Sequence, residues 1–137
     1  MRTSDPATAP TRPAVDRFLA AVESGAFPDD LYTPDATLDA TVPGWRFRTQ
    51  GAAAIVEEYG RWFTGPCQLH VIERHALPDG EVVRYLQRYG EAAGGIRTHH
   101  VHLLTVEDDR VARDVVFCGG RWEPAVVAKM GAAAHAG

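Results

Sequence analysis

The stretch IRTHHVHLLTVEDDRVARDVVFC, residues 96–118, decides the fold. Apolar and polar residues alternate on both sides of Asp108-Asp109, which is the pattern of two strands joined by a short turn. The same period of two runs through the preceding residues, with further joints at Pro78-Asp79-Gly80 and Gly94-Gly95. We therefore predict an antiparallel meander of four strands over residues 68–77, 81–91, 96–106 and 110–118.

The sequence before the meander has a helical period. A first helix is predicted from the start signals Thr11 and Pro13 to Gly25, and a second over residues 51–63, because apolar residues recur there on one side. A strand over 36–42 lies between them, and residues 45–50 are expected to form a loop with large side chains. The first helix buries Val15, Phe18, Leu19 and Val22.

Helices on one face of an antiparallel sheet make an α+β fold. We expect the long sheet to curve around the two helices and to leave a pocket for a small ligand. The 137 residues suffice for one domain, predicted over 13–123. A flexible leader is expected over 1–12, and an Ala-rich tail, either a short helix or loose, over 124–137.

Composition argues against several classes of protein. The net charge of −4 leaves no basic stripe for nucleic acid. No apolar run approaches the roughly 20 residues that a membrane helix needs. Cys67 and Cys118 form no Cys-x-x-Cys motif, which predicts a reducing, cytoplasmic location.

Turn lengths predict which side chains share the inner face of the sheet. A two-residue turn at Asp79-Gly80 pairs Leu77 with Val82, and one at Gly94-Gly95 pairs Tyr89 with His100. The inward set is then Tyr85, Gln87, Tyr89, His100 and His102.

The last turn decides whether Asp114 joins this set. A plain two-residue turn places Leu103 opposite Asp114, which then faces outward. A three-residue type I turn with a bulge at Asp109 shifts the parity by one and places His102 opposite Asp114. We favour the bulged turn, which directs both side chains inward and Arg113 outward.

The pair His102 and Asp114 is the best candidate for chemistry. A carboxylate that accepts from one imidazole nitrogen fixes the tautomer and leaves the other nitrogen to exchange a proton near neutral pH. Alternatively, Asp114 itself is the base, or the pair only satisfies its own hydrogen bonds inside the core. His100 and His102 could also converge on zinc with His70 or Asp114, but no supporting ligand spacing accompanies them, and we predict no metal.

Five stretches carry a family resemblance: LYTPDATL at 31–38, PGW at 43–45, GAAAI at 51–55, VHLLTV at 101–106 and the segment from Asp109 to Asp114. Together with the order of elements, they resemble the SnoaL-like branch of the nuclear transport factor 2 (NTF2-like) superfamily. The resemblance covers about residues 13–123. It implies a cone-shaped α+β barrel with a deep apolar cavity and dimerisation through the outer sheet face.

Members of that superfamily include isomerases, cyclases, epoxide hydrolases, dehydratases and binding proteins, and their site residues carry over only in part. Phe18 stands where ketosteroid isomerases place a tyrosine, and Ala40 where they place the base. The Arg-x-Asp pair of limonene-epoxide-hydrolase-like members is absent, since the matching strand reads Tyr85-Leu86-Gln87. Asp114 matches the late-strand acid/base aspartate of the polyketide cyclases.

We therefore expect a cofactor-independent acid/base enzyme (cyclase, isomerase, dehydratase or hydrolase) acting on a largely apolar small molecule, with Asp114 and His102 as the catalytic pair. The alternatives are a non-catalytic ligand-binding protein of the same fold and a structural dimerisation module. An outward apolar stripe predicts a homodimer: Val101, Leu103, Val115 and Phe117. The predicted substrate contacts are His100, Tyr85, Gln87, Tyr89, Trp45, Tyr32 and Trp62.

Overall fold

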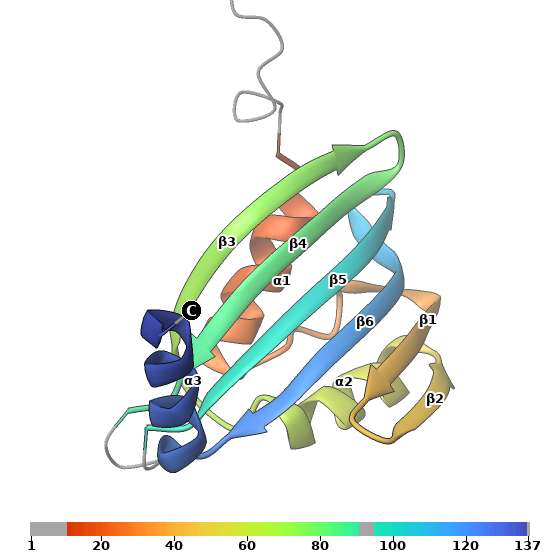
Figure 1. Cartoon of the computed structure of the whole chain (residues 1–137). Coiled ribbons are helices and arrows are strands. Elements are labelled where there is room, and N and C mark those ends of the chain that lie inside the picture. The colour runs from red at the N-terminus through yellow and green to blue at the C-terminus, as the bar shows by residue number, and fades with distance from the viewer. Residues whose placement is uncertain (1–10, 91–94, 137) are drawn as a thin grey trace, which may run out of the picture.

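The computed structural model describes residues 11–90 and 95–136, and these form six strands and three helices (Figure 1). In chain order the elements are α1 (Pro13–Ser24), β1 (Tyr32–Val42), β2 (Trp45–Gln50), α2 (Ala52–Trp62), β3 (Gln68–Leu77), β4 (Gly80–Arg88), β5 (Arg97–Glu107), β6 (Arg110–Trp122) and α3 (Pro124–Ala136).

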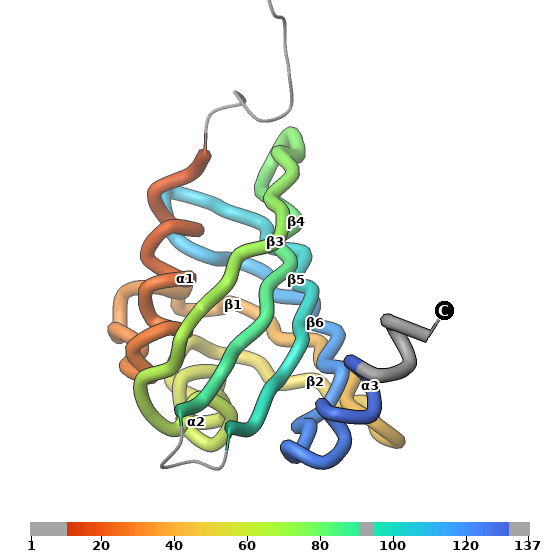
Figure 2. Tube along the Cα trace, turned by 60° about the vertical axis from the view of Figure 1, so that its left-hand side comes forward, coloured from red at the N-terminus to blue at the C-terminus, as the bar shows by residue number. Residues whose placement is uncertain are grey.

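All six strands belong to one curved, open sheet in the order β2-β1-β6-β5-β4-β3. Neighbouring strands are antiparallel except β1 and β6, which run parallel. Helices α1 and α2 cover one face of the sheet, and α3 lies on the opposite side (Figure 2). The predicted α+β class is therefore confirmed.

Strand β2 replaces the loop that was predicted over residues 45–50. It pairs with β1 from Val42–Trp45 to Thr37–Gln50 through a tight turn at Pro43-Gly44. Trp45 and Phe47 alternate with Arg46 and Arg48, which is a strand period, but the run is short and four of the six residues of this edge strand are exposed.

The core lies between the two covering helices and the sheet. The predicted face of α1 is buried, with Phe18 and Val22 fully enclosed. Helix α2 adds Ile55 and Tyr59. Gly25 ends α1 in the left-handed conformation (φ 79°), and a side chain there would meet the backbone of Gly65 at 2.8 Å.

Hydrogen bonds attach the start of α1 to the β3–β4 hairpin. Residues 1–10 of the predicted leader lie outside the described residues, but Arg12 next to them donates to the carbonyl oxygens of Leu77, Pro78 and Gly80. The buried Glu81 accepts from the Arg12 backbone N–H at 2.8 Å and from both branches of the Arg74 guanidinium at 2.7 and 2.8 Å.

Two predicted strand registers are wrong, although the inward faces of β4 and β5 are as predicted. Leu77 pairs with Gly80 rather than Val82. His100 pairs with Tyr85 rather than Tyr89, because the β4–β5 connection is longer than the predicted two-residue turn, part of which lies outside the described residues. These slips, of two and four residues, are even and leave Tyr85 and His100 on the predicted face. In β3, a bulge between Val71 and Glu73 shifts the pairing by one further residue toward Gln68.

The predicted turn between β5 and β6 is also wrong. Asp108 and Asp109 both have positive φ, 51° and 58°, and form a two-residue type I′ turn that pairs Glu107 with Arg110. The extra residue is Ala112 in β6, where the pairing shifts from Val106–Val111 to Thr105–Arg113. Asp114 therefore lies opposite Leu104, not His102, and still points inward.

Candidate functional site

A chain of hydrogen bonds links three buried side chains beneath the helices. His102 Nδ1 lies 2.8 Å from Asp114 Oδ1, and His102 Nε2 lies 2.8 Å from the Tyr85 hydroxyl oxygen. All three side chains have no exposed surface. His102 and Asp114 meet, as predicted from the sequence, and they do so as diagonal neighbours across β5 and β6.

Asp114 also accepts hydrogen bonds from two tyrosines. The Tyr59 hydroxyl of α2 lies 2.7 Å from Oδ2, and the Tyr32 hydroxyl of β1 lies 3.4 Å from the same oxygen. Burial, reinforced by the negative charge of Asp114, raises the pKa of Tyr32 and Tyr59 well above the usual value. Both phenols therefore remain hydrogen-bond donors to the carboxylate at neutral pH.

These contacts set the direction of the hydrogen bonds. An ionised carboxylate only accepts, so His102 donates from Nδ1–H to Asp114. In the neutral imidazole, Nε2 is then an acceptor, and it accepts a hydrogen bond from the Tyr85 hydroxyl. Burial also raises the pKa of Tyr85. The three groups form a path along which one proton can move between the tyrosine and the imidazole, with the aspartate balancing the resulting charge.

The space around His102 is filled rather than hollow. The Phe18 ring packs against the imidazole with ring centres 4.8 Å apart, and the Tyr85 ring stacks on it at 5.4 Å. A pocket of about 190 Å³ opens instead beside His100, one step further along the same face of β5. It is lined by Arg61, Trp62, Thr98, His100, Cys118 and Arg121.

His100 separates this pocket from the buried chain. Its side chain is 3% exposed, and its ring lies 5.3 Å from that of Tyr85 and 6.0 Å from that of Trp62. Among residues 11–90 and 95–136, no group hydrogen-bonds its Nδ1. Burial, with a smaller contribution from His102, lowers the pKa of His100 to about 3, so that its imidazole is neutral at pH 7.

The remaining residues predicted to contact the substrate do not all lie at the pocket. Gln87 and Tyr89 are buried, but Gln87 is occupied within the protein: it accepts from the Thr98 hydroxyl at 2.8 Å and donates to the Tyr89 oxygen at 3.2 Å. Trp62 lines the pocket. Trp45 is 69% exposed at the β1–β2 turn and lines none of the described pockets, so the structure does not bring it to the other predicted residues.

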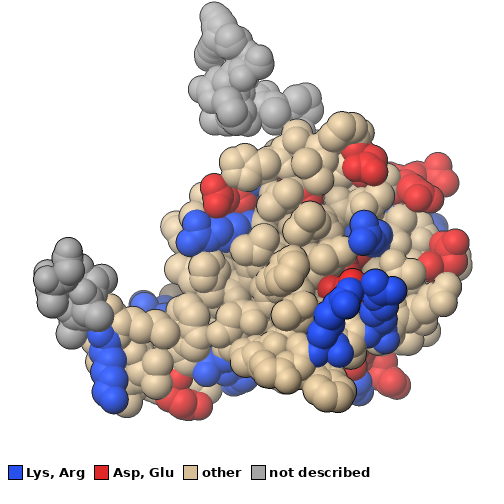
Figure 3. Space-filling model, turned by 45° about the vertical axis from the view of Figure 1, so that its right-hand side comes forward, with Lys and Arg blue, Asp and Glu red and all other residues tan. Residues whose placement is uncertain are grey.

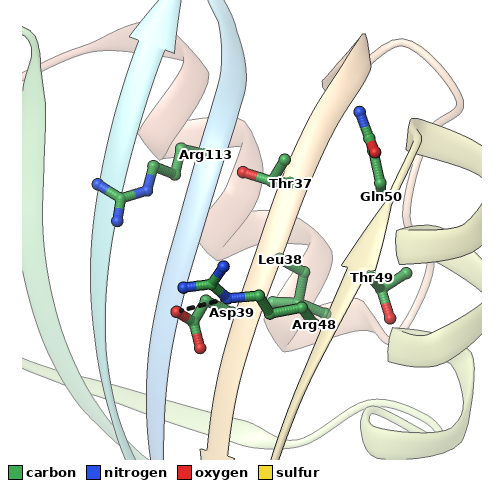
Figure 4. Close-up of a pocket in the computed structure, with 7 residues that line it drawn as sticks. All are labelled: Thr37, Leu38, Asp39, Arg48, Thr49, Gln50 and Arg113. Carbon is green, nitrogen blue, oxygen red and sulfur yellow. Dashed lines mark ion pairs between the residues drawn. The ribbon is translucent and has the colours of Figure 1, made fainter.

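A larger pocket of about 440 Å³ lies away from these groups, between β1, β2 and β6 (Figure 4). Arg48 and Asp39 form an ion pair that lines it, and Arg113 extends from β6. Hydrogen bonds from Arg46, followed by its charge and that of Arg48, lower the pKa of Asp39. A carboxylate held ionised by two guanidinium groups is a weak base. We therefore favour the smaller pocket, which adjoins the imidazoles, as the functional site.

Three residues of the site were not predicted from the sequence: Tyr59, Arg61 and Arg121. Tyr59 was grouped with the apolar face of α2, although its hydroxyl required a buried partner, and that requirement was the available signal. Arg61 and Arg121 lie at the ends of α2 and β6, and no local pattern relates two such distant positions.

Metal-binding clusters and membrane-spanning helices are absent from the described part of the chain. No group of three or more His, Cys, Asp or Glu side chains there is arranged to hold a metal ion. None of the helices in residues 11–90 and 95–136 has the length and apolar character needed to span a membrane.

Two helices packed inside a curved, open sheet define the NTF2-like class of α+β folds. The pattern of the SnoaL-like domain matches residues 15–114, and the chain therefore belongs to the SnoaL-like family. No curated protein matches it.

Solved structures share the fold at low sequence identity. An NTF2-like protein of unknown function from Mesorhizobium loti is 21% identical, with a TM-score of 0.63 over 78% of this chain and 88% of that one. A candidate ketosteroid isomerase from Kribbella flavida is 22% identical, with a TM-score of 0.60 over 82% and 80%. An LEH-like epoxide hydrolase from M. tuberculosis is 15% identical, with a TM-score of 0.59 over 77% and 79%.

Proposed function

We propose that the protein is a cofactor-independent enzyme that transfers a proton on a small, largely apolar molecule, in the manner of an isomerase, cyclase, dehydratase or hydrolase. The observation that carries this proposal is the hydrogen-bonded chain Asp114–His102–Tyr85, which lies behind the pocket that His100 lines. The candidate ketosteroid isomerase and the LEH-like epoxide hydrolase among the structural neighbours have the same fold, and their names denote reactions of this general kind.

In this proposal His102 is the acid/base group and Asp114 stabilises its protonated form. The substrate enters beside His100, and movement of the His100 ring opens the way to the Tyr85 hydroxyl. A proton taken from the substrate passes through the Tyr85 hydroxyl to His102 Nε2, while Asp114 accepts from Nδ1. Full burial of these groups strengthens each electrostatic interaction.

Hydrogen–deuterium exchange tests this proposal without a known substrate. Cyclic ketones are incubated with the protein in D₂O, and loss of the α-proton signal is followed by NMR. We expect Asp114→Asn to slow the exchange by about 100-fold or more, the usual contribution of general acid/base catalysis. Asp109→Asn, at an exposed carboxylate, is the matched control. Equal exchange rates in Asp114→Asn and the parent would contradict the assignment.

One observation favours a ligand-binding protein as the second candidate. Asp114 already accepts from His102, Tyr59 and Tyr32, which leaves a self-satisfied network without any substrate. If the protein only binds its ligand, no cavity-sized compound is turned over, and the affinity for the ligand is unchanged in the Asp114→Asn variant.

We also propose that the outer face of the sheet forms a homodimer. Phe117 is 50% exposed and Leu103 is 39% exposed, and they lie on adjacent strands with Val101 and Val115 as their cross-strand partners. Figure 3 shows few charged side chains over the middle of this side of the molecule. Exposed apolar residues in a row across two strands are typical of a surface that a partner covers.

A further inference from the structure

The pocket beside His100 has a charge pattern that proton transfer does not explain. Arg61 reaches it from the last turn of α2 and Arg121 from the end of β6. Both side chains are exposed. Two guanidinium groups from separate elements therefore stand at the mouth of one small, partly aromatic pocket.

The acidic groups in contact with this mouth do not cancel its charge. Glu58 is ion-paired with Arg61 and also accepts from the Trp62 indole N–H at 3.0 Å. Arg121 stands over the Tyr89 ring at 5.6 Å and has no ion pair within the described residues. With Arg61 and Arg121 against Glu58, one positive charge remains. A guanidinium group offers paired N–H donors that match a carboxylate.

His100 lines the inner end of the pocket, and one nitrogen of its ring has no partner in the described part of the chain. His100 Nδ1 is buried and has no hydrogen bond to any described residue. Such a group is costly unless something binds it. Trp62 lies nearly parallel to the His100 ring, at 27° and 6.0 Å, and supplies a flat apolar wall between the two polar ends.

We propose that this pocket binds a small organic carboxylate with a flat hydrocarbon body: Arg61 and Arg121 hold the carboxylate, and His100 hydrogen-bonds a hydroxyl or carbonyl group at the other end. The inference rests on the proposed function, since it names the class of ligand for the same site. It concerns binding, however, and can be tested without turnover.

Titration with benzoate and benzamide, followed by NMR, tests the carboxylate end. The two probes have the same shape and differ in charge. We expect benzoate to bind at least about tenfold more tightly, as charge-assisted hydrogen bonds do. Arg121→Gln and Arg61→Gln should each weaken benzoate severalfold and leave benzamide unchanged. Arg17→Gln, on the exposed side of α1, is the matched arginine control and should change neither. Equal affinities for the two probes, or unchanged benzoate binding in the Arg121→Gln variant, would overturn the proposal.

A second comparison tests the His100 end. We expect 4-hydroxybenzoate to bind severalfold more tightly than benzoate to the parent, and this advantage to disappear in His100→Phe while benzoate affinity stays within about twofold. An advantage that persists in His100→Phe would remove His100 from the proposal.

Asp114→Asn separates this inference from the proposed function, because Asp114 does not line the pocket. We expect benzoate to bind this variant as it binds the parent, although proton exchange is lost. Exchange by the parent without any benzoate binding would overturn the carboxylate inference alone. Benzoate binding with exchange unaffected by Asp114→Asn would overturn the proposed function alone.

Discussion

Replacing His100 with phenylalanine should make the protein more stable. His100 is 3% exposed, and its Nδ1 has no partner among the described residues. A buried polar group without a hydrogen bond costs about 1–3 kcal/mol. Phenylalanine retains the ring contacts with Trp62, Phe63 and Tyr85, and the adjoining pocket accommodates its extra volume. We expect a gain of roughly 1–2 kcal/mol at pH 7.5.

The gain should increase as the pH falls. The pKa of His100 is about 3 in the folded protein, against 6.5 for an ordinary histidine. Below pH 6.5 the unfolded chain binds a proton that the folded chain does not, so the histidine protein loses about 1.4 kcal/mol of stability per pH unit down to pH 3. Between pH 6.5 and pH 5 this amounts to about 2 kcal/mol, which the phenylalanine variant does not lose.

Urea unfolding of both proteins, followed by tryptophan fluorescence at pH 7.5, 6.0 and 5.0, measures the effect. The quantity of interest is the difference between the two free energies of unfolding. The contributions of carboxylates that titrate in both proteins cancel in this difference. Misfit of the phenylalanine ring would shift this difference equally at every pH. A difference that is constant from pH 7.5 to pH 5.0 would therefore refute the neutral, buried state of His100.

Three further predictions concern the rest of the molecule. Burial raises the pKa of all four tyrosines. Above pH 10 the unfolded chain therefore loses protons first, and stability should fall with rising pH by about 1.4 kcal/mol per pH unit for each phenol; tyrosinate absorbance that develops before unfolding would contradict this. Glu81→Gln breaks the buried pair with Arg74 and should lower the free energy of unfolding by roughly 2–4 kcal/mol in urea titrations, whereas a loss below about 0.5 kcal/mol would show that the pair is unimportant. Phe117→Glu puts a charge into the proposed dimer surface and should yield a monomer in sedimentation experiments, with a monomeric parent as the outcome that excludes the dimer.

Much of the fold could be predicted because its signals are local. Alternation from Gln68 onward predicted four strands, and the spacing of Val15, Phe18, Leu19 and Val22 predicted the buried face of α1. Strand β2 was missed because it is short and mostly exposed, so that Phe47 is the single apolar side chain of the strand that packs against the core. Its pairing with β1, and the parallel pairing of β1 with β6, depend on contacts between distant parts of the chain.

The candidate site was predicted in part for the same reason. The inward direction of Tyr85, His100, His102 and Asp114 depends only on odd and even positions along a strand, and this was right although three registers were wrong. Asp114 faces inward through the extra residue Ala112, not through the turn.

The sequence by itself determined the α+β class, the helix faces and the set of side chains directed inward, because these follow from the period of apolar residues within each element. Only the tertiary structure decided which inward groups touch: that Tyr59 of α2 shares Asp114 with His102, and that Arg61 and Arg121 meet at one pocket. Such contacts depend on where the helices lie across the curved sheet. That placement results from packing of the whole core, which no local stretch encodes.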